Sequence, residues 1–252
     1  VYMNNFKIIF WILIVNLSFS NSISGYDLAK MIDDKEQPKS SKSIISMELI
    51  NIKKDRKKIK EMVSLSKENG DKMLMFFKSP KRDKGVGFLK IETEEDDKIS
   101  LFIPKLKKIR RISSSNQSDS FMGSDLSFED MLSRNLDEFD YKIISESEDI
   151  YKLESISLND DSEYYRHISW ITKNELLIIK EESYDKNNKL LKEKSFKQIK
   201  MEGYNLISEI DVINVQDQHR TILGIQTLEV DGNIDNDTFN EINLKRSEKF
   251  LQ

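Results

Sequence analysis

The sequence predicts a mainly β protein: one sandwich or barrel of about ten to twelve antiparallel strands, with two or three helices. Apolar and polar residues alternate with a period of two over much of the chain, which is the pattern of half-buried strands. Turns rich in Asn, Asp and Gly, such as Asp185–Lys189, separate these runs. The chain has 252 residues but only three prolines and eight glycines. We therefore expect a single domain, 23–252, without a long disordered linker.

The first expected element is a short amphipathic helix, because Leu28, Met31 and Ile32 recur at helical spacing. Alternating strands follow from Ser43 onward. Asn-Gly-Asp at 69–71 predicts a hairpin turn between two of these strands.

The return strand of that hairpin is KMLMFFK at 72–78, and GVGFLKIE at 85–92 forms the next strand. Pro104 is expected to end the following strand, 99–103, because proline cannot donate to a ladder of backbone hydrogen bonds. A further strand then resumes at 107–113.

The second half of the chain is expected to begin with a helix at Ser127, reading SFEDMLSRNL. Glu129 and Asp130 lie in its first turn and suit the positive end of the helix dipole. Strands return from Asp140, with the sequences KIISES, YKLESISL, YYRHISWIT, ELLIIKEESY, KLLKEKSFKQI, NLISEIDVINV and RTILGIQTLEV. Residues 235–244 are expected to form a short helix or coil.

Residues 1–22 have the layout of a secretory signal peptide. Lys7 supplies a positive charge ahead of the apolar run IIFWILIV at 8–15, and small and polar residues follow up to Gly25. This run is too short for a membrane span of ~20 residues. We expect cleavage between residues 20 and 25 and an exported protein; an uncleaved anchor or a buried helix is the alternative.

Composition excludes several classes of site. The formal net charge of −4 gives no global positive field that would recruit nucleic acid. The absence of cysteine excludes disulfides, thiolate metal sites and a lipid-anchored cysteine. Asp231-x-Asn233-x-Asp235 resembles the opening of a calcium loop, but Asn236 stands where that loop needs Gly and Ile242 where it needs Glu. We expect no metal and no cofactor.

The sequence does not predict an enzyme. Its two histidines, His167 and His219, lie in no recognisable nucleophile–base motif, and we interpret both as structural or surface residues. No Gly-x-Ser-x-Gly elbow is present, and Gly123-Ser124-Asp125 lacks the flanking strand and helix of such an elbow.

One short segment, Lys105–Arg111, is strongly basic and reads KLKKIRR. It is basic enough for nucleic acid or anionic headgroups, but export argues against nucleic acid. In a strand, Lys107, Ile109 and Arg111 would face one side and their neighbours the other. The alternation therefore predicts no single basic face.

Methionine and aromatic residues are frequent in the expected strands. A packed core is the simpler interpretation, because buried apolar residues usually do no more than pack. An internal cavity is the alternative, since flexible methionine side chains suit irregular apolar ligands. Composition does not decide between the two. The residues concerned are Met47, Met62, Met73, Met75, Met122, Phe76, Phe77, Phe88, Phe102, Phe121 and Trp170.

The central segment Leu101–Met131, LFIPKLKKIRRISSSNQSDSFMGSDLSFEDM, carries a family resemblance. It resembles the signature of the LolA-like outer-membrane lipoprotein-sorting proteins: a strand ending in proline, an arginine-rich strand, a serine-rich loop and an F-M-G-S-D run ahead of paired carboxylates. Gln117 stands where that loop often has Lys or Arg. The matching motif residues are Pro104, Arg110, Arg111, Gly123, Ser124, Asp125, Glu129 and Asp130.

The resemblance implies an unclosed, strongly curved antiparallel β-barrel with helices plugging its mouth. It further implies a monomeric, non-enzymatic carrier in the periplasm of a Gram-negative (diderm) bacterium. Such a carrier holds the acyl chains of a lipoprotein or lipid during transfer toward the outer membrane. The resemblance also implies an inner-membrane RND-type transporter as a partner. The alternative is a non-enzymatic binding or adaptor subunit of such a transporter or of an envelope complex. The ligand-binding residues expected on this basis are Phe121, Met122, Phe102, Phe88, Met73, Met75 and Trp170.

Overall fold

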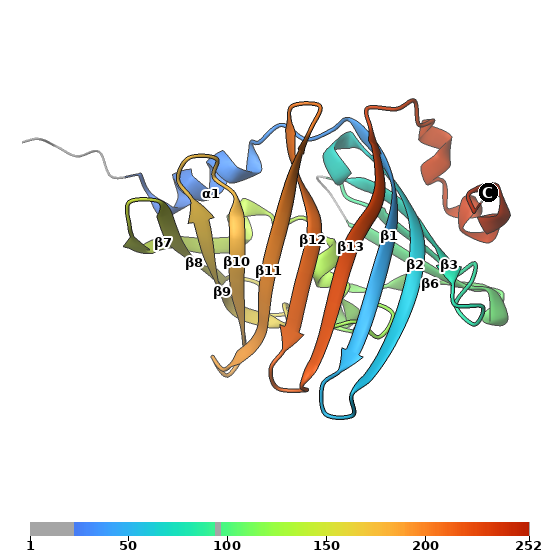
Figure 1. The fold of residues 1–252 in the computed structure, drawn as a ribbon, viewed down its shortest axis with the longest axis horizontal. Coiled ribbons are helices and arrows are strands. Elements are labelled where there is room, and N and C mark those ends of the chain that lie inside the picture. The colour runs from blue at the N-terminus through green and yellow to red at the C-terminus, as the bar shows by residue number, and fades with distance from the viewer. Residues whose placement is uncertain (1–22, 94–96, 252) are drawn as a thin grey trace, which may run out of the picture.

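A computed structural model describes residues 23–93 and 97–251. Thirteen strands in this part of the chain form one antiparallel sheet, in the order β6-β5-β4-β3-β2-β1-β13-β12-β11-β10-β9-β8-β7 (Figure 1). The predicted signal peptide, 1–22, lies outside the described residues and stays a prediction. The strands are β1 Ser40–Asn51, β2 Arg56–Lys67, β3 Lys72–Ser79, β4 Gly87–Ile91, β5 Lys98–Ile103, β6 Lys108–Ile112, β7 Phe139–Glu146, β8 Ile150–Ser157, β9 Tyr164–Thr172, β10 Ile178–Asp185, β11 Leu190–Met201, β12 Tyr204–Asn214 and β13 His219–Val230.

The sheet is curved but not closed, as the resemblance implied. Strands β6 and β7 follow one another in the chain, yet they form its two opposite edges. Residues 113–138, which we call the crossing segment, must therefore travel from one edge to the other. They run behind the central strands in Figure 1. The face of the sheet that this segment covers is called the concave face below.

Strand β3 is buried on both faces from Leu74 to Phe77. Met75 and Phe77 belong to a cluster that includes Phe121 of the crossing segment, and the intervening Phe76 belongs to a second cluster. The second cluster is completed by Phe239 and Leu244, because the C-terminal 3-10 helices Asn236–Phe239, Glu241–Lys245 and Ser247–Lys249 cover the outer face. Burial on both faces explains why KMLMFFK is almost continuously apolar and yet forms a strand.

The expected N-terminal helix is α1, Gly25–Asp33. The Ser24 side chain accepts a hydrogen bond from the Asp27 N–H, which caps the helix. The helix packs against β7 at one edge of the sheet. A glycine is needed at position 25, since a Cβ atom there would lie 2.6 Å from the Tyr141 carbonyl carbon.

Three expectations about the fold need correction. The structure has thirteen strands, one more than the upper end of the expected range. The sequence predicted two or three helices, but α1 is the only α-helix of the described residues, and the crossing segment covers much of the concave face. The helix expected from Ser127 is wrong, because only the short 3-10 helices Glu129–Met131 and Leu136–Glu138 form there. Leu132 is already extended, at φ −93° and ψ 154°.

None of the described helices is both long and apolar enough to cross a membrane.

Candidate functional site

The crossing segment carries a tight turn at Phe121–Ser124. The Ser124 N–H donates to the Phe121 carbonyl at 3.0 Å, and both central residues have positive φ, 53° at Met122 and 78° at Gly123. This is the signature of a type I′ turn, in which glycine is favoured. Buried Lys60 of β2 donates to the Met122 carbonyl at 2.8 Å and forms an ion pair with Asp83 at 3.0 Å. The turn is thereby fixed to the sheet.

Asp125 anchors the next part of the segment to β13. Its Oδ2 atom lies 2.6 Å from the Thr221 hydroxyl and 2.7 Å from His219 Nδ1. The Asp125 N–H donates to the same threonine oxygen at 2.9 Å. Asp125 is buried, so these contacts replace the water that its carboxylate gives up.

Glu129 and Asp130 anchor the segment farther along the sheet. Glu129 accepts from the Ser162 hydroxyl and from the Glu163 N–H. Burial raises the pKa of the Glu129 carboxyl, despite these donors. Asp130 accepts from the Ser127 N–H at 2.9 Å, and the Asp130 N–H donates to the Ser127 hydroxyl at 3.3 Å, which is a reciprocal capping arrangement. The carboxylates of the motif thus serve tertiary anchoring, and no α-helix forms.

A group of charged side chains lies on the concave face and is called the ionic cluster. Cross-strand pairs align it: Glu181 lies opposite Ser169 and Lys194, and Ser183 lies opposite His167 and Lys192. The members from the sheet are buried at 1–5% exposure, and the crossing segment supplies Asp130 and Arg134. The ionic cluster comprises Asp130, Arg134, His167, Glu181, Lys192 and Lys194.

Ion pairs connect the whole cluster. Arg134 forms a bidentate pair with Glu181, at 2.6 and 2.7 Å. Lys194 lies 2.6 Å from Asp130 and 3.3 Å from Glu181, so it joins the two carboxylates. Lys192 contacts Asp130 at 3.2 Å and the Tyr164 hydroxyl at 2.5 Å. Two residues of the crossing segment are therefore held by charges from β10 and β11.

The cluster shifts the pKa of its members in consistent directions. Burial by itself would raise the pKa of Asp130, but the charges of Lys194 and Lys192 outweigh it and hold that pKa well below the usual range. The pKa of Glu181 is likewise held well below its usual value, because the charges of Arg134 and Lys194 outweigh the effect of burial. Burial, aided by Arg134, lowers the pKa of His167 well below its usual value, so this imidazole is neutral near pH 7.

The other half of the concave face is the apolar cluster. Phe121 and Phe128 of the crossing segment insert among side chains of the sheet, and the Phe88 and Phe121 rings meet edge to face at 5.2 Å. The two phenylalanines of the segment are themselves 5.8 Å apart. The buried members are Met47, Leu49, Met62, Met75, Phe77, Val86, Phe88, Ile99, Leu101, Ile112, Phe121 and Phe128.

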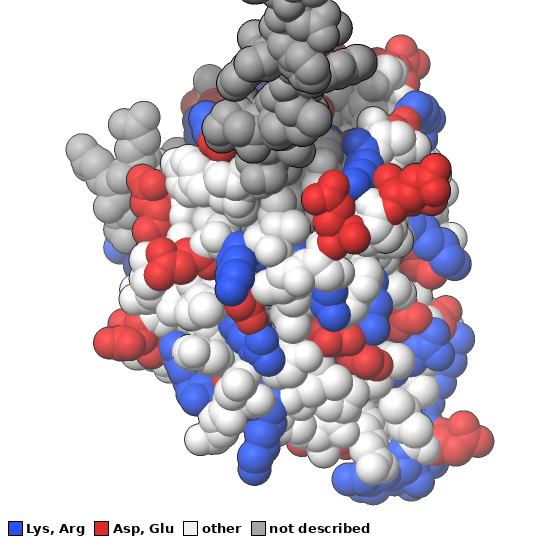
Figure 2. Space-filling view, turned by 90° about the vertical axis from the view of Figure 1, so that its left-hand side faces the viewer, with Lys and Arg blue, Asp and Glu red and all other residues white. Residues whose placement is uncertain are grey.

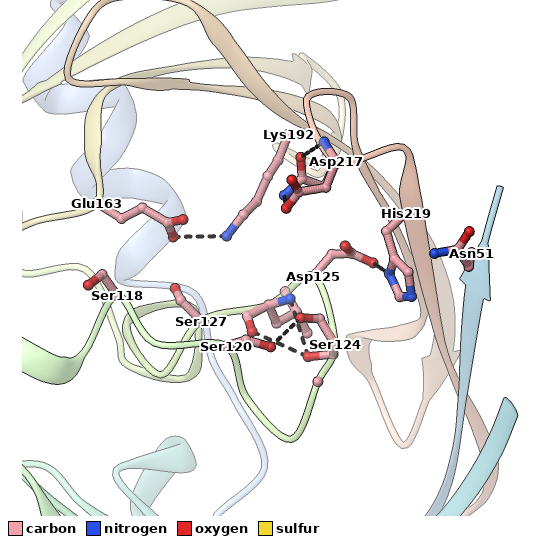
Figure 3. A pocket seen from close by; sticks show the side chains of 13 residues that line it. Asn51, Ser118, Ser120, Ser124, Asp125, Ser127, Glu163, Lys192, Asp217 and His219 are labelled. Carbon is pink, nitrogen blue, oxygen red and sulfur yellow. Dashed lines mark hydrogen bonds and ion pairs between the residues drawn. The ribbon is translucent and has the colours of Figure 1, made fainter. Parts of the chain in front are cut away.

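A polar pocket of about 540 Å³ lies beside the turn of the crossing segment, against β11, β13 and the β12–β13 turn (Figure 3). Lys192, Asp217 and His219 reach it from the sheet side. The serines across from them are engaged with their own chain. Ser120 donates to the Ser124 carbonyl at 2.6 Å, and Ser124 donates to the Phe121 carbonyl at 2.7 Å. These hydroxyls are thus not paired with His219 as nucleophiles would be.

The structure brings five of the seven expected ligand-binding residues together. Phe88, Met73, Met75, Phe121 and Met122 all belong to the apolar cluster or pack against it. The side chains of this cluster pack against one another, which agrees with the interpretation of these residues as a packed core.

The other two residues lie elsewhere. Phe102 packs in the cluster of the outer face. Trp170 follows Ser169 in β9 and therefore faces away from the ionic cluster. Its ring is flanked by Lys152 and Lys180, at 4.5 and 4.7 Å.

The eight residues of the family motif also lie in two places: some in the crossing segment and the others outside it. Asp125, Glu129 and Asp130 anchor the crossing segment to other parts of the chain. Ser124 forms its hydrogen bonds within the segment, and Gly123 lies in its turn. Arg110 and Arg111 are exposed on β6, where they lie 3.4 Å from Asp119 and Glu241 respectively. Pro104 begins a 3-10 helix, Pro104–Leu106, directly after β5.

The ionic cluster was not predicted from the sequence, in which His167 was interpreted only as a structural or surface residue. The signal was present only as alternation: Lys192 and Lys194 share a face of one strand, as do Glu181 and Ser183 of another. Exposed strands show the same alternation of charges, so burial could not be inferred from it. Within the described ranges, no group of three or more metal-ligating side chains is placed to hold a metal ion.

Comparisons with known proteins agree with this fold. A family model described as "Uncharacterized protein" matches residues 69–246, well over half of the chain. The chain is 27% identical to an outer membrane lipoprotein-sorting protein domain from Vibrio parahaemolyticus, with a TM-score of 0.81 over 88% of this chain and 98% of that one.

Two further structures are similar. A DUF1329 family protein from Desulfovibrio piger is also 27% identical, with a TM-score of 0.80 over 87% of this chain and 97% of the other. A LolA superfamily protein from Nitrosomonas europaea is 15% identical, with a TM-score of 0.70 over 88% and 99% of the two chains, and its similarity concerns the fold. No curated protein matches the sequence.

Proposed function

Because the chain belongs to the LolA-like family of outer-membrane lipoprotein-sorting proteins, we propose that it is a periplasmic carrier for the acyl chains of a lipoprotein or lipid. The observation that carries this proposal is the apolar cluster, which is a continuous apolar surface of the sheet covered by two phenylalanines of a single segment. Acyl chains take the place of these side chains when the turn of the crossing segment withdraws.

The energetics of such an exchange are plausible in magnitude. Each buried CH2 group of an acyl chain contributes about 0.8 kcal/mol. Without a carrier, the acyl chain would be exposed to water during transfer between membranes. Withdrawal of Phe121 and Phe128 gives up apolar contacts of the same kind, so acyl chain and crossing segment compete for one surface.

The two ends of the crossing segment are held differently, which identifies the end that moves in this proposal. Asp130 and Arg134 are held by several ion pairs with buried partners. The turn at Phe121–Ser124 is held by one lysine contact to a backbone carbonyl and by the hydrogen bonds of Asp125. We expect the turn to withdraw while the ionic cluster stays formed.

An introduced disulfide between the turn and β13 tests the proposal. Asp125 and Thr221 touch through both side-chain and backbone atoms, and the natural chain has no cysteine that could interfere. In the Asp125→Cys/Thr221→Cys variant, the oxidised form should lose uptake of a fluorescent fatty acid and the reduced form should recover it. The same preparation is therefore its own control. Equal uptake by both forms would contradict the proposed movement.

Lipid extraction complements that test. Mass spectrometry of the protein purified under native conditions should find co-purified acyl lipid. Absence of any lipid, together with absence of fatty-acid uptake, would remove the carrier function.

The packed interior also supports a second candidate, a binding or adaptor subunit of an envelope complex with an RND-type transporter as its partner. Phe77, Phe88 and Met47 are fully buried by side chains of the protein itself, as expected for a module that only binds proteins. Affinity purification from envelope fractions distinguishes the two. An adaptor brings a transporter and no lipid, whereas a carrier brings lipid.

A further inference from the structure

The end of the molecule opposite α1 and β7 carries a concentration of positive charge. Three segments far apart in the sequence meet there, at the right-hand end of Figure 1 beside the C terminus: the β3–β4 loop 80–85, the β5–β6 turn with β6, 104–111, and the C-terminal 245–249. Gly85 marks the junction, because a Cβ atom built on it would lie 3.1 Å from the Ser247 hydroxyl and 3.4 Å from the Pro104 ring.

Exposed cations dominate these segments, and we call them the basic end. Asp83 is buried, so Glu248 is the only exposed carboxylate that the three segments contain. The exposed cations are Lys81, Arg82, Lys84, Lys105, Lys107, Lys108, Arg110, Arg111, Lys245, Arg246 and Lys249.

Most of this charge is not neutralised within the molecule. The three arginines Arg82, Arg110 and Arg111 have carboxylate partners, at 3.2–3.4 Å. None of the other eight cations forms an ion pair with a described residue. The protein as a whole is acidic, with a net charge of −4, so this end differs in sign from the whole. The opposite end, which faces the viewer in Figure 2, has acidic and basic groups interspersed.

The backbone under these cations is fixed. Asp83 pairs with buried Lys60, and the N–H groups of Asp83 and Lys84 both donate to the Pro80 carbonyl. The Phe250 ring, next to Lys249, stacks on the Phe76 ring of β3 at 5.2 Å. The charges are thus held together before any partner arrives, and binding needs little ordering of the chain.

We propose that the basic end is a docking surface for the anionic headgroups of a membrane leaflet. Charge complementarity selects an anionic partner. Leu106 favours a lipid surface over an acidic protein, because this residue is 63% exposed at the tip of a turn between Lys105 and Lys107. An exposed aliphatic group between lysines suits the boundary between headgroups and acyl chains, where the lysines reach the phosphates. This surface is separate from the concave face, so the proposal does not depend on the carrier function.

Vesicle co-sedimentation of the full chain tests the proposal. Vesicles of equal parts phosphatidylglycerol and phosphatidylcholine should bind the protein at low salt, and vesicles of phosphatidylcholine alone should not. Binding should weaken as salt is added, since exposed charges are screened. Each basic residue near an anionic surface contributes about a fivefold gain in affinity, so the variant Lys84→Glu/Lys105→Glu/Lys249→Glu, with one change in each segment, should bind at least about 100-fold more weakly.

The matched control is Lys142→Glu/Lys186→Glu/Lys189→Glu, which makes the same change in net charge at exposed lysines of β7 and the β10–β11 turn. It should keep most of the vesicle binding. Equal losses in both triple variants would overturn the proposal, because net charge alone would then govern binding.

A second basic element, the β1–β2 turn, provides another comparison. The turn and the start of β2 carry exposed Lys53, Lys54 and Lys58. If Lys53→Glu/Lys54→Glu/Lys58→Glu abolishes vesicle binding and the basic-end variant retains it, docking occurs at the turn and the proposal is overturned. Binding to polyglutamate without binding to anionic vesicles would also overturn it, in favour of an acidic protein partner.

Discussion

The two halves of the concave face solve the same problem by opposite means. Each must hold the crossing segment against the sheet. Under β1–β5 the contact is apolar and is made by Phe121 and Phe128. Under β9–β11 it is ionic, and Asp130 and Arg134 insert between Lys192, Lys194 and Glu181.

This contrast indicates in which half a ligand can take the place of the crossing segment. An apolar contact is non-directional, so an acyl chain can replace a phenylalanine at little net cost. A buried charge that loses its partner has no such substitute, and its desolvation is not compensated. The apolar half therefore suits a ligand, and the ionic half suits a permanent attachment.

The substitution with the largest expected effect on stability disrupts the ionic half of the concave face. Glu181→Ala leaves Arg134 and Lys194 without their shared carboxylate. The free energy of unfolding should therefore fall by an amount near the upper end of the range of about 3–5 kcal/mol. Chemical denaturation measures it. The control is Glu182→Ala, the next residue of β10, which faces outward and pairs with partly exposed Lys180; it should cost only about 0–1 kcal/mol. Similar costs for both variants would refute a distinct buried network.

A second substitution, at Phe121, disrupts the packing of the apolar half. Phe121 is 1% exposed among Phe77, Phe88 and Phe128. Phe121→Ala should lower the free energy of unfolding by about 3 kcal/mol, the low end for such truncations, because the crossing segment can shift to fill the space. Fatty-acid affinity should rise, since the segment competes less well for the sheet. A loss of affinity would instead mean that Phe121 is part of the ligand-binding surface.

Acid should act on the ionic half first. His167 has a lowered pKa, so the unfolded chain takes up a proton below pH 6.5 that the folded protein does not, and stability falls as the pH drops below this value. Asp130 and Glu181 also have lowered pKa values, so they add stability above the ordinary carboxyl pKa that is lost at lower pH. Denaturation curves at a series of pH values measure both steps. His167→Gln should remove the first step only; an unchanged profile would contradict this assignment.

The smallest expected effect lies outside both halves. Trp170 is on the outer face between Lys152 and Lys180, so Trp170→Ala should cost about 1 kcal/mol, mainly from lost cation–π contacts. Fatty-acid binding should not change. The comparison is Phe88→Ala on the concave face, expected to cost about 3–5 kcal/mol. A clear loss of fatty-acid binding in the Trp170 variant would place the ligand elsewhere than proposed.

Sequence reasoning succeeded for elements with strong local signals. The strand 72–78, the turn at 69–71, the strand end before Pro104 and the first helix all form as expected. It failed at Ser127, where the helical signal of Glu129 and Asp130 is real but is overridden. Their carboxylates have partners in the β8–β9 loop and on β11, and these contacts outweigh the helix propensity of a short segment.

A mainly β protein with a LolA-like signature could be predicted from the sequence, because alternation, turn residues and the motif at Leu101–Met131 are local patterns. Which residues face one another depends on how the strands and the crossing segment come together in the fold. Trp170 and Phe88 are equally apolar in the sequence, yet they lie on opposite faces. Lys192 and Lys105 are equally charged, yet one is buried against Asp130 and the other is exposed at the basic end. The physical reason is that burial depends on the register of thirteen strands and on a segment that crosses between their edges, and no single strand encodes either.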